Sequence, residues 1–350
     1  MAACSPPKLL APLLLLLLLL LLASPALARS RHVVAFRAPG LRPSSLLWDS
    51  AAQHFLVGSR GRPAVTSVSD AGVVEAVVSD PDLPADASLP SLALDPTRRR
   101  LLAVVAGPSP ACLAAYDLRS PRPHRRLFLT PLPEPADPAA VAIDPAMGAA
   151  FVTSASGGVI WRVDLQGEAS VFSRSEALSG GLAGIAHVRK GYLLAVQTAT
   201  GNVIKVDAED GKARAVLIGG KNGVAGAEAI AIRGDGSAAV VGGSAARIVT
   251  SDDGWGEAGV YDKLAVGGRA GGVAVREGRK VYVLIEEEVE GSSGKEEGGW
   301  GYRVEEMEWE RDREGEWVVG LVLLGLGLAY FLYWRFQMGR LVKDMNKKRL

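Results

Sequence analysis

Short apolar segments, separated by turn residues, recur through the middle of the chain at a nearly constant interval. Runs of valine, isoleucine, leucine and alanine bounded by such turns are typical of β-strands. Six of these segments begin a repeating unit, and one residue near the middle of each serves as its marker: Leu47, Ala93, Ala142, Ala186, Ala231 and Ala274. The markers lie roughly 45 residues apart with about four strands to a unit, which is the period and content of a β-propeller blade.

The six units predict an all-β fold, a six-bladed β-propeller with four-stranded blades, over residues 29–304. One blade cannot bury both of its faces, so neighbouring blades must stack around a ring. The sixth unit lacks a fourth strand, and we expect Val33–Phe36 to supply it from the other end of the domain. A pair of β-sandwiches is the alternative, but a sandwich needs no repeat of this regularity.

The N-terminal segment has the three-part pattern of a secretory signal peptide. Lys8 precedes a leucine-rich run from Leu9 to Leu22, and Ala26-Leu27-Ala28 places small residues at the two positions that a signal peptidase requires. The run is short for a membrane span, which needs about 20 residues. We therefore expect residues 1–28 to be a signal peptide that is removed. A retained signal anchor is the alternative.

A second apolar segment, residues 317–334, contains no charge and is long enough to cross a thin bilayer as a helix. Aromatic residues stand at both of its edges, as in the aromatic belts of membrane helices. Acidic residues dominate the charged stalk predicted at 305–316, and basic residues dominate the tail at 335–350, which the positive-inside rule places in the cytosol. The pattern predicts a single-pass type I membrane protein with one transmembrane helix. A buried helix is the alternative.

The tail ends in Lys347-Lys348-Arg349-Leu350. Lysines at these positions of a cytosolic C-terminus resemble the dilysine signal through which coatomer returns proteins to the endoplasmic reticulum (ER), so Lys347 and Lys348 are candidate ER-retrieval residues. With the short span, they predict an ER membrane protein whose propeller lies in the lumen. The alternative is plain basic charge attracted to anionic lipid, with residence later in the secretory pathway or at the plasma membrane.

Composition excludes some partners and some sources of stability. The net charge is +1, which gives no electrostatic argument for nucleic-acid binding. Cys4 lies in the predicted signal peptide, so Cys112 has no disulfide partner within the predicted lumenal domain. Stability must therefore come from packing. The acidic, glycine-rich segment 286–299 is interpreted as a solvated loop of the last blade, because its glutamates lack the spacing of calcium ligands.

Two blades resemble those of the regucalcin/gluconolactonase-like superfamily of six-bladed propellers. The first blade does so through Leu47-Trp48-Asp49, Phe55–Ser59 and Gly72-Val73-Val74, and the fourth through segments between Gly181 and Asp207. The superfamily includes strictosidine synthase-like proteins, paraoxonase-like lactonases and plant proteins described as calcium-dependent phosphotriesterase-like. In its lactonases, carboxylates and asparagine amides hold a divalent metal in the central channel.

The resemblance implies a metal site in which Glu228 occupies the position of a ligand aspartate. Asp137 is a second inner-strand carboxylate, and calcium is the metal that such oxygen ligands suit. The ligand pattern is incomplete, because Ala183 stands where an asparagine is expected and Pro43-Ser44-Ser45 replaces a Glu-Gly-Pro-like entry. The alternative is that Glu228 and Asp137 are ion-paired or solvated in a wet channel.

Two further residues are candidates for the channel mouth. Arg269 is expected to face the mouth, where it could pair with Glu228 or Asp137. His187 lies in an inner strand and is interpreted as a packed or hydrogen-bonded residue rather than a catalytic base.

Two functions remain open at this point. The first is a binding scaffold that presents its loops and central mouth to a lumenal protein or a small-molecule ligand. The second is a calcium-dependent lactone or ester hydrolase that uses Glu228 and Asp137. No nucleophile elbow, zinc motif or phosphate loop points to another reaction.

Overall fold

The computed structural model describes most of the predicted propeller. Its described residues are 31–107, 110–134, 137–219, 223–287 and 301–309, with parts of 324–342. The predicted signal peptide lies outside them, as do residues 310–316 of the predicted stalk, residues 317–323 of the predicted span, and Lys347 and Lys348. Residues 330–340 are helical. Within the described part of the chain, no helix is both long enough and apolar enough to cross a membrane.

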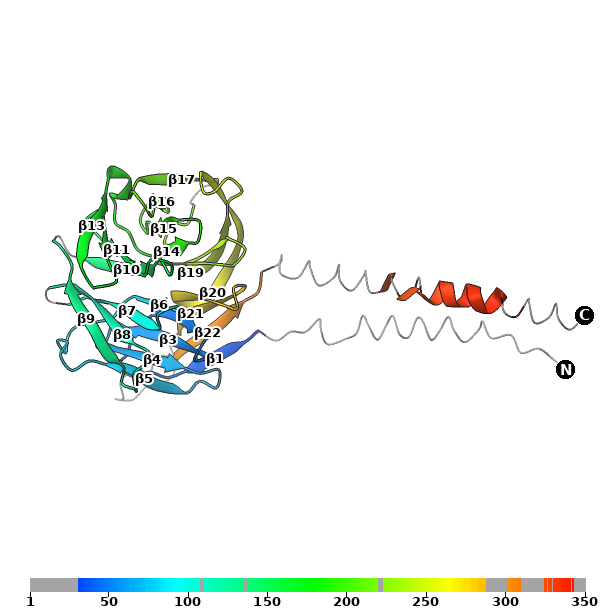
Figure 1. Ribbon diagram of the computed structural model, residues 1–350, viewed down its shortest axis with the longest axis horizontal. Helices are drawn as coiled ribbons and strands as arrows, with labels where there is room; N and C mark the ends of the chain where they lie inside the picture. The colour runs from blue at the N-terminus through cyan, green and yellow to red at the C-terminus, as the bar shows by residue number, and fades with distance from the viewer. Residues whose placement is uncertain are drawn as a thin grey trace, which may run out of the picture.

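The first three predicted units each form a separate four-stranded antiparallel sheet with its strands in chain order (Figure 1). The first sheet contains β2 (Pro43–Asp49), β3 (His54–Ser59), β4 (Ala64–Val68) and β5 (Val74–Ser79). The second contains β6 (Leu92–Asp95), β7 (Arg100–Val105), β8 (Cys112–Asp117) and β9 (Arg125–Pro131). The third contains β10 (Pro138–Ile143), β11 (Ala150–Ser154), β12 (Val159–Val163) and β13 (Ala169–Arg174).

The remaining strands form one ten-stranded sheet. A short 3-10 helix, η2 (Glu176–Leu178), precedes β14 (Ile185–Val188), β15 (Tyr192–Val196), β16 (Val203–Asp207) and β17 (Ala213–Gly219), which pair in chain order. The others are β18 (Ala229–Ile232), β19 (Ala238–Thr250), β20 (Glu257–Arg276), β21 (Lys280–Glu287), β22 (Gly301–Met307) and β1 (Val33–Phe36).

The long strand β20 explains why the later units are joined. Its residues from Gly259 to Ala265 pair with β19, whereas those from Arg269 to Arg276 pair with β21. The start of β20 also pairs in parallel with the end of β17. One continuous strand therefore forms the outer edge of the fifth unit and the inner strand of the sixth. In the described part of the chain the fifth unit has three strands (β18, β19 and the start of β20) and not the predicted four, because β19 runs without a break from Ala238 to Thr250.

The N-terminal strand completes the sixth unit as the sequence predicts. Strand β1 pairs antiparallel with β22, in a register that runs from Val33 opposite Glu305 to Phe36 opposite Tyr302. The four paired residues of β1 are those expected from the sequence. This pairing holds the two ends of the domain together (Figure 1).

Apolar clusters fill the space between consecutive units. In one of them, Leu102 and Leu113 of the second sheet pack with Val152 and Trp161 of the third, and all four are buried. Another cluster joins the first unit to the last through Phe55 and the strands β1, β20, β21 and β22. Central strands such as β7 and β11 are buried throughout, since both faces of each sheet are covered. Units packed in this way form a β-propeller.

The folded domain reaches beyond the predicted boundary at residue 304. Strand β22 continues to Met307, and the indole of Trp309 is buried against the cluster that β19, β20 and β21 form. Residues 305–309 therefore belong to the propeller, not to the charged stalk predicted at 305–316. Their glutamates are tolerated because the outer part of a blade has solvent on one side.

Candidate functional site

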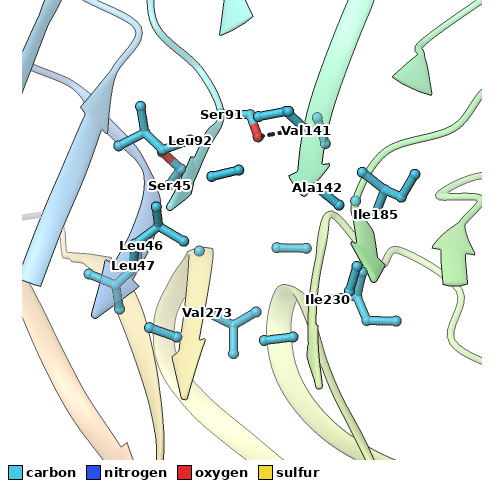
Figure 2. A pocket seen from close by; sticks show the side chains of 18 of the residues that line it. Ser45, Leu46, Leu47, Ser91, Leu92, Val141, Ala142, Ile185, Ile230 and Val273 are labelled. Atoms are coloured by element: carbon cyan, nitrogen blue, oxygen red, sulfur yellow. Dashed lines mark hydrogen bonds between the residues drawn. The ribbon is translucent and has the colours of Figure 1, made fainter. Parts of the chain in front are cut away.

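A cavity of about 400 Å³ lies where the innermost strands of the six units meet. One segment from each unit lines it, and each of these segments contains the marker residue predicted from the sequence. Figure 2 shows the side chains of these segments arranged around the opening. The repeat in the sequence is thus the repeat that builds the cavity wall.

Neighbouring inner strands run in the same direction along the cavity. Near their starts, the Ser91 hydroxyl accepts a hydrogen bond of 3.1 Å from the backbone N–H of Val141 (Figure 2). At their ends, Nε2 of His187 lies 3.9 Å from Oδ2 of Asp144. The cavity therefore has an N-terminal mouth, formed by strand starts, and a C-terminal mouth, formed by strand ends.

Most side chains along the cavity wall are aliphatic, while polar atoms contribute about as much of its surface as apolar atoms do. Apart from Ser45 and Ser91, the side chains labelled in Figure 2 are leucine, isoleucine, valine and alanine. Glycines permit the strands to approach, since a Cβ on Gly184 would lie 2.8 Å from Cα of Ala229. A Cβ on Gly272 would come equally close to the backbone of the first unit. The ionisable side chains among the lining residues that the structure describes are Arg60, His187 and Glu228.

An ion pair lies at the N-terminal mouth. Glu228 immediately precedes β18, and its Oε1 is 3.3 Å from Nη2 of Arg269, which β20 presents. The side chains of Glu228 and Arg269 are 27% and 59% exposed. Arg269 therefore pairs with one of the two candidate carboxylates, and water screens the interaction strongly.

The second candidate carboxylate is directed elsewhere. Asp137 immediately precedes β10, is exposed, and accepts a hydrogen bond of 2.9 Å from the hydroxyl of Ser156. It is not among the residues that line the cavity. The structure thus brings Glu228 and Arg269 together, but it does not bring Asp137 to the same wall.

His187 faces the C-terminal mouth. Burial lowers the pKa of its imidazole, and the nearby charge of Asp144 opposes that shift only in part. The ring is therefore neutral at neutral pH. Asp144 itself accepts a hydrogen bond of 2.8 Å from the backbone N–H of Ala146 and so caps the turn after β10. This arrangement is that of a packed histidine beside a structural carboxylate.

The residues present do not fit the calcium site that the resemblance implies. Ca²⁺ takes about six to eight oxygen ligands. Glu228 is engaged by Arg269 and Asp137 by Ser156. Across the described ranges, no group of three or more histidine, cysteine or acidic side chains is placed to hold a metal ion. We therefore derive no reaction step through calcium at this site.

A buried ion pair joins the first two units near the C-terminal mouth. Arg99 of the second unit binds both carboxylate oxygens of Asp49 in the first unit, at 2.7 and 2.9 Å. Burial by itself would raise the pKa of Asp49, but the hydrogen bonds and positive charge of Arg99 outweigh it, so this pKa lies below its usual value. The side chain of Asp49 is only 2% exposed, which makes the pair strong.

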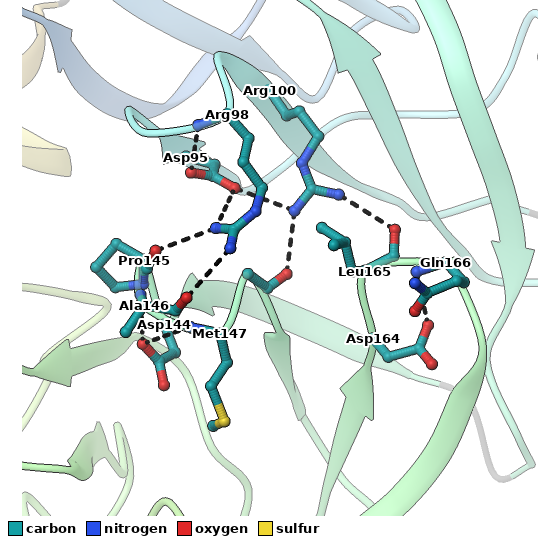
Figure 3. A network of polar contacts seen from close by, with 11 residues as sticks. Asp95, Arg98, Arg100, Asp144, Pro145, Ala146, Met147, Asp164, Leu165 and Gln166 are labelled. Atoms are coloured by element: carbon teal, nitrogen blue, oxygen red, sulfur yellow. Dashed lines mark hydrogen bonds and ion pairs between the residues drawn. The ribbon is translucent and has the colours of Figure 1, made fainter.

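An equivalent network joins the second and third units (Figure 3). Oδ2 of Asp95, which is fully buried, accepts a hydrogen bond of 3.0 Å from Arg100. Arg100 also donates to the carbonyl oxygen of Gly148 at 3.1 Å, and Arg98 donates to that of Pro145 at the same distance. The carboxylate thus fixes two arginines that reach the neighbouring sheet.

The last and first units are joined by a similar contact. The guanidinium of Arg276 lies 4.1 Å from the centre of the Trp48 ring and pairs with Asp70 at 3.0 Å. Cation–π contacts of this kind add to the attraction between charges.

Sequence reasoning did not assign a role to these residues, although a signal for part of them was present. Asp49, Asp95 and Asp144 end the first apolar segment in three successive units. That repetition marks a structural position at the end of each inner strand. No repeated pattern in the sequence marks Arg60 as a cavity residue, because Arg60 lies in the turn between β3 and β4.

No protein-family model matches the chain, and no curated protein matches it. Solved structures do match in fold. The allergen Mala s 1 of Malassezia sympodialis is 17% identical, with 79% of this chain and 96% of that chain covered and a TM-score of 0.64. The PQQ-bound aldose sugar dehydrogenase of Streptomyces coelicolor is 18% identical, with 80% and 99% covered and a TM-score of 0.54.

Virginiamycin B lyase from Staphylococcus aureus is 10% identical, with 80% of this chain and all of that chain covered and a TM-score of 0.51. Identities this low establish the fold alone. The comparisons therefore support a β-propeller and do not place the chain within the regucalcin/gluconolactonase-like superfamily.

Proposed function

We propose that this protein is a six-bladed β-propeller that acts as a binding scaffold and takes a ligand in its central cavity. The observation that carries the proposal is the cavity wall, where six inner strands present aliphatic side chains around about 400 Å³. Ligand sites of small molecules are typically concave, largely apolar and of this size range. The exposed ion pair of Glu228 with Arg269 lies at the N-terminal mouth, where its polar groups can contact a ligand.

Six blades are the interpretation that best accounts for the strand pairing. The three separate sheets are three blades, and β14–β17 form a fourth. The outer part of β20 completes a fifth with β18 and β19, while its inner part forms the sixth with β21, β22 and β1. The six lining segments of the cavity support the same count.

The alternative is the calcium-dependent lactone or ester hydrolase. Two of the similar structures are named as enzymes, a dehydrogenase and a lyase, whereas another is named as an allergen. A propeller fold therefore does not select a reaction. The incomplete donor set around Glu228 argues against the hydrolase.

A substitution in the cavity wall tests the binding proposal. A Cβ on Gly271 would have its nearest contact 3.8 Å away, so a side chain there can point into the cavity without moving the backbone. We expect Gly271→Phe to block labelling of the cavity by a photoreactive ten-carbon alcohol. Labelled peptides would be mapped by mass spectrometry on the full chain in lipid nanodiscs.

The matched control uses the same strand. Gly259 of β20 is remote from the cavity and has open space at its Cβ position, so Gly259→Phe should leave labelling intact. Cavity labelling that persists in Gly271→Phe, or that is absent from the unmodified protein, would contradict the proposal.

We further propose a type I protein of the ER membrane. The support is in the sequence, namely the leucine-rich N-terminal segment, the uncharged residues 317–334 and the tail with Lys347 and Lys348. Replacing both lysines with serine should move the protein beyond the ER in fractionated cells. Arg340→Ser with Lys343→Ser removes the same charge and should not. Equal redistribution of both variants would favour lipid attraction over coatomer.

A further inference from the structure

The turn between β3 and β4 is fixed in one conformation at the N-terminal mouth. The Ser59 hydroxyl donates to the carbonyl oxygen of Leu41 and accepts hydrogen bonds from the backbone N–H groups of Gly61 and Arg62, both at 3.2 Å. The N–H of Gly61 donates to the same carbonyl at 3.0 Å. Because a Cβ at Gly61 would lie 2.2 Å from the carbonyl oxygen of Gly40, only glycine fits there.

This turn holds Arg60 at the cavity. The backbone N–H of Arg60 donates to the carbonyl oxygen of Arg42 at 3.0 Å, and Arg60, which is exposed, is one of the residues that line the cavity. Among the described residues, the structure gives the guanidinium of Arg60 no carboxylate partner. Because the backbone of Arg60 is fixed and its guanidinium has no bound carboxylate, this guanidinium can bind an anion through charge-assisted hydrogen bonds.

The other charged side chains that line the cavity near this mouth do not oppose an anion, and the carboxylate of Asp137 at the same end is hydrogen-bonded to Ser156 outside the cavity wall. Glu228 is the one acidic side chain among the described residues that line the cavity, and Arg269 already neutralises it. Arg269 is more than half exposed and keeps further N–H donors for a ligand. Among the described residues that line the cavity near this mouth, Arg60 therefore leaves one unbalanced positive charge.

We infer that the ligand is a small amphiphile with a single carboxylate, whose aliphatic part fills the cavity and whose carboxylate binds Arg60. The inference rests on the proposed binding function and adds the class of ligand. A guanidinium binds a carboxylate through two parallel hydrogen bonds. One unbalanced cation matches a monoanion better than a phosphate monoester, which carries more charge at neutral pH. The cavity volume suits one short chain and not a diacyl lipid.

The experiment compares two photoreactive ten-carbon probes, an acid and the matching alcohol, on the full chain in lipid nanodiscs. Peptides labelled at the inner strands are quantified by mass spectrometry. We expect the acid to label the cavity more strongly than the alcohol. Arg60→Gln should reduce labelling by the acid about tenfold, the effect of one charge-assisted hydrogen bond, and leave labelling by the alcohol unchanged.

Matched variants separate a charge effect from a folding effect. Arg62→Gln changes the same residue type in the same turn, but Arg62 does not line the cavity, so both probes should label as before. Arg60→Lys should restore part of the preference for the acid. Equal labelling by acid and alcohol, or equal effects of Arg60→Gln and Arg62→Gln, would overturn the carboxylate inference alone. Absence of cavity labelling by either probe would overturn the binding function as well.

An alkyl phosphate of the same chain length is the third probe. Weaker labelling than by the acid supports a monoanionic ligand. Stronger labelling by the phosphate would overturn the choice of carboxylate.

Discussion

At the C-terminal mouth of the cavity, the carboxylates Asp49 and Asp95 are buried and held by arginines that connect neighbouring units, whereas at the N-terminal mouth the charged side chains are exposed. Asp49 and Asp95 are almost inaccessible to water and each is held by arginine. Glu228 and Arg269 are paired but solvated, and Arg60 lines the cavity. The same residue types therefore serve different purposes at the two ends.

The difference indicates at which mouth of the cavity a charged residue can be replaced without loss of the fold. Removal of one partner from a buried pair leaves a desolvated charge, which is costly, while removal of one partner from an exposed pair leaves a charge in water. The C-terminal mouth is accordingly expected to fix the packing of the units. The N-terminal mouth, where a charge can be replaced at little cost in stability, is the end at which we place the proposed ligand.

The largest expected effect is at Asp95. Asp95→Ala leaves Arg98 and Arg100 without their carboxylate at a buried position, and we expect a loss of about 3–5 kcal/mol in the free energy of unfolding. Urea unfolding of the full chain, followed by fluorescence, would measure it. Asp210→Ala removes an exposed partner of Lys212 and should leave the free energy of unfolding nearly unchanged. Similar losses in both variants would contradict the comparison.

A smaller effect is expected at the pair of Asp49 and Arg99. Arg99→Gln should lower the free energy of unfolding at pH 7 by about 2 kcal/mol, because the buried carboxylate loses its charged partner. Arg122 makes an ion pair of the same 2.7 Å length with Glu75, but both side chains are exposed. Arg122→Gln is therefore the control, and it should change stability by less than about 1 kcal/mol.

The pH dependence of the Asp49 pair has a definite sign. The pKa of Asp49 in the folded protein is below its usual value of 3.8, so the folded state favours the ionised carboxylate. This contribution is present above the unfolded pKa and is lost as the pH falls through the folded pKa. The stability difference between the parent protein and Arg99→Gln should shrink below pH 3.8, as measured by unfolding at a series of pH values. A difference independent of pH would show that Arg99 acts by packing alone.

The smallest effect is expected at Glu228. Glu228→Gln should change the free energy of unfolding by less than about 1 kcal/mol, because its ion pair is exposed. Neither calcium nor a chelator should move the melting temperature of the full chain, since a ligand shifts stability only when it binds the folded state. A calcium-dependent rise in melting temperature that Glu228→Gln abolishes would instead support the hydrolase.

Much of the strand order could be predicted from the sequence. Residues 64–68 and 203–207 form strands at the predicted bounds, as does Val33–Phe36, because short apolar runs between turn residues are local signals. The continuity of β20 could not be predicted, because the consecutive glycines Gly267 and Gly268 in its middle are typical of a turn. Whether such glycines bend or extend the chain depends on the strands that pair beside them.

The candidate site was predicted less completely. The sequence suggested Arg269 near a carboxylate, and Glu228 is that carboxylate. It also suggested that Asp137 shares the site, but Asp137 binds Ser156 outside the cavity wall. A residue just before a strand can point toward the channel or away from it, and neighbouring loops decide which.

The sequence by itself determined the all-β repeat and the six inner strands, because both follow from the spacing of apolar residues and turn residues along the chain. It also contains the N-terminal and C-terminal segments on which the membrane proposal rests. Only the tertiary structure placed Arg60 at the cavity, separated Asp137 from Glu228 and buried Asp49 and Asp95 against arginines. The reason is physical, since the burial of these side chains and the pair of Asp49 with Arg99 depend on contacts between units that lie about 45 residues or more apart in the chain.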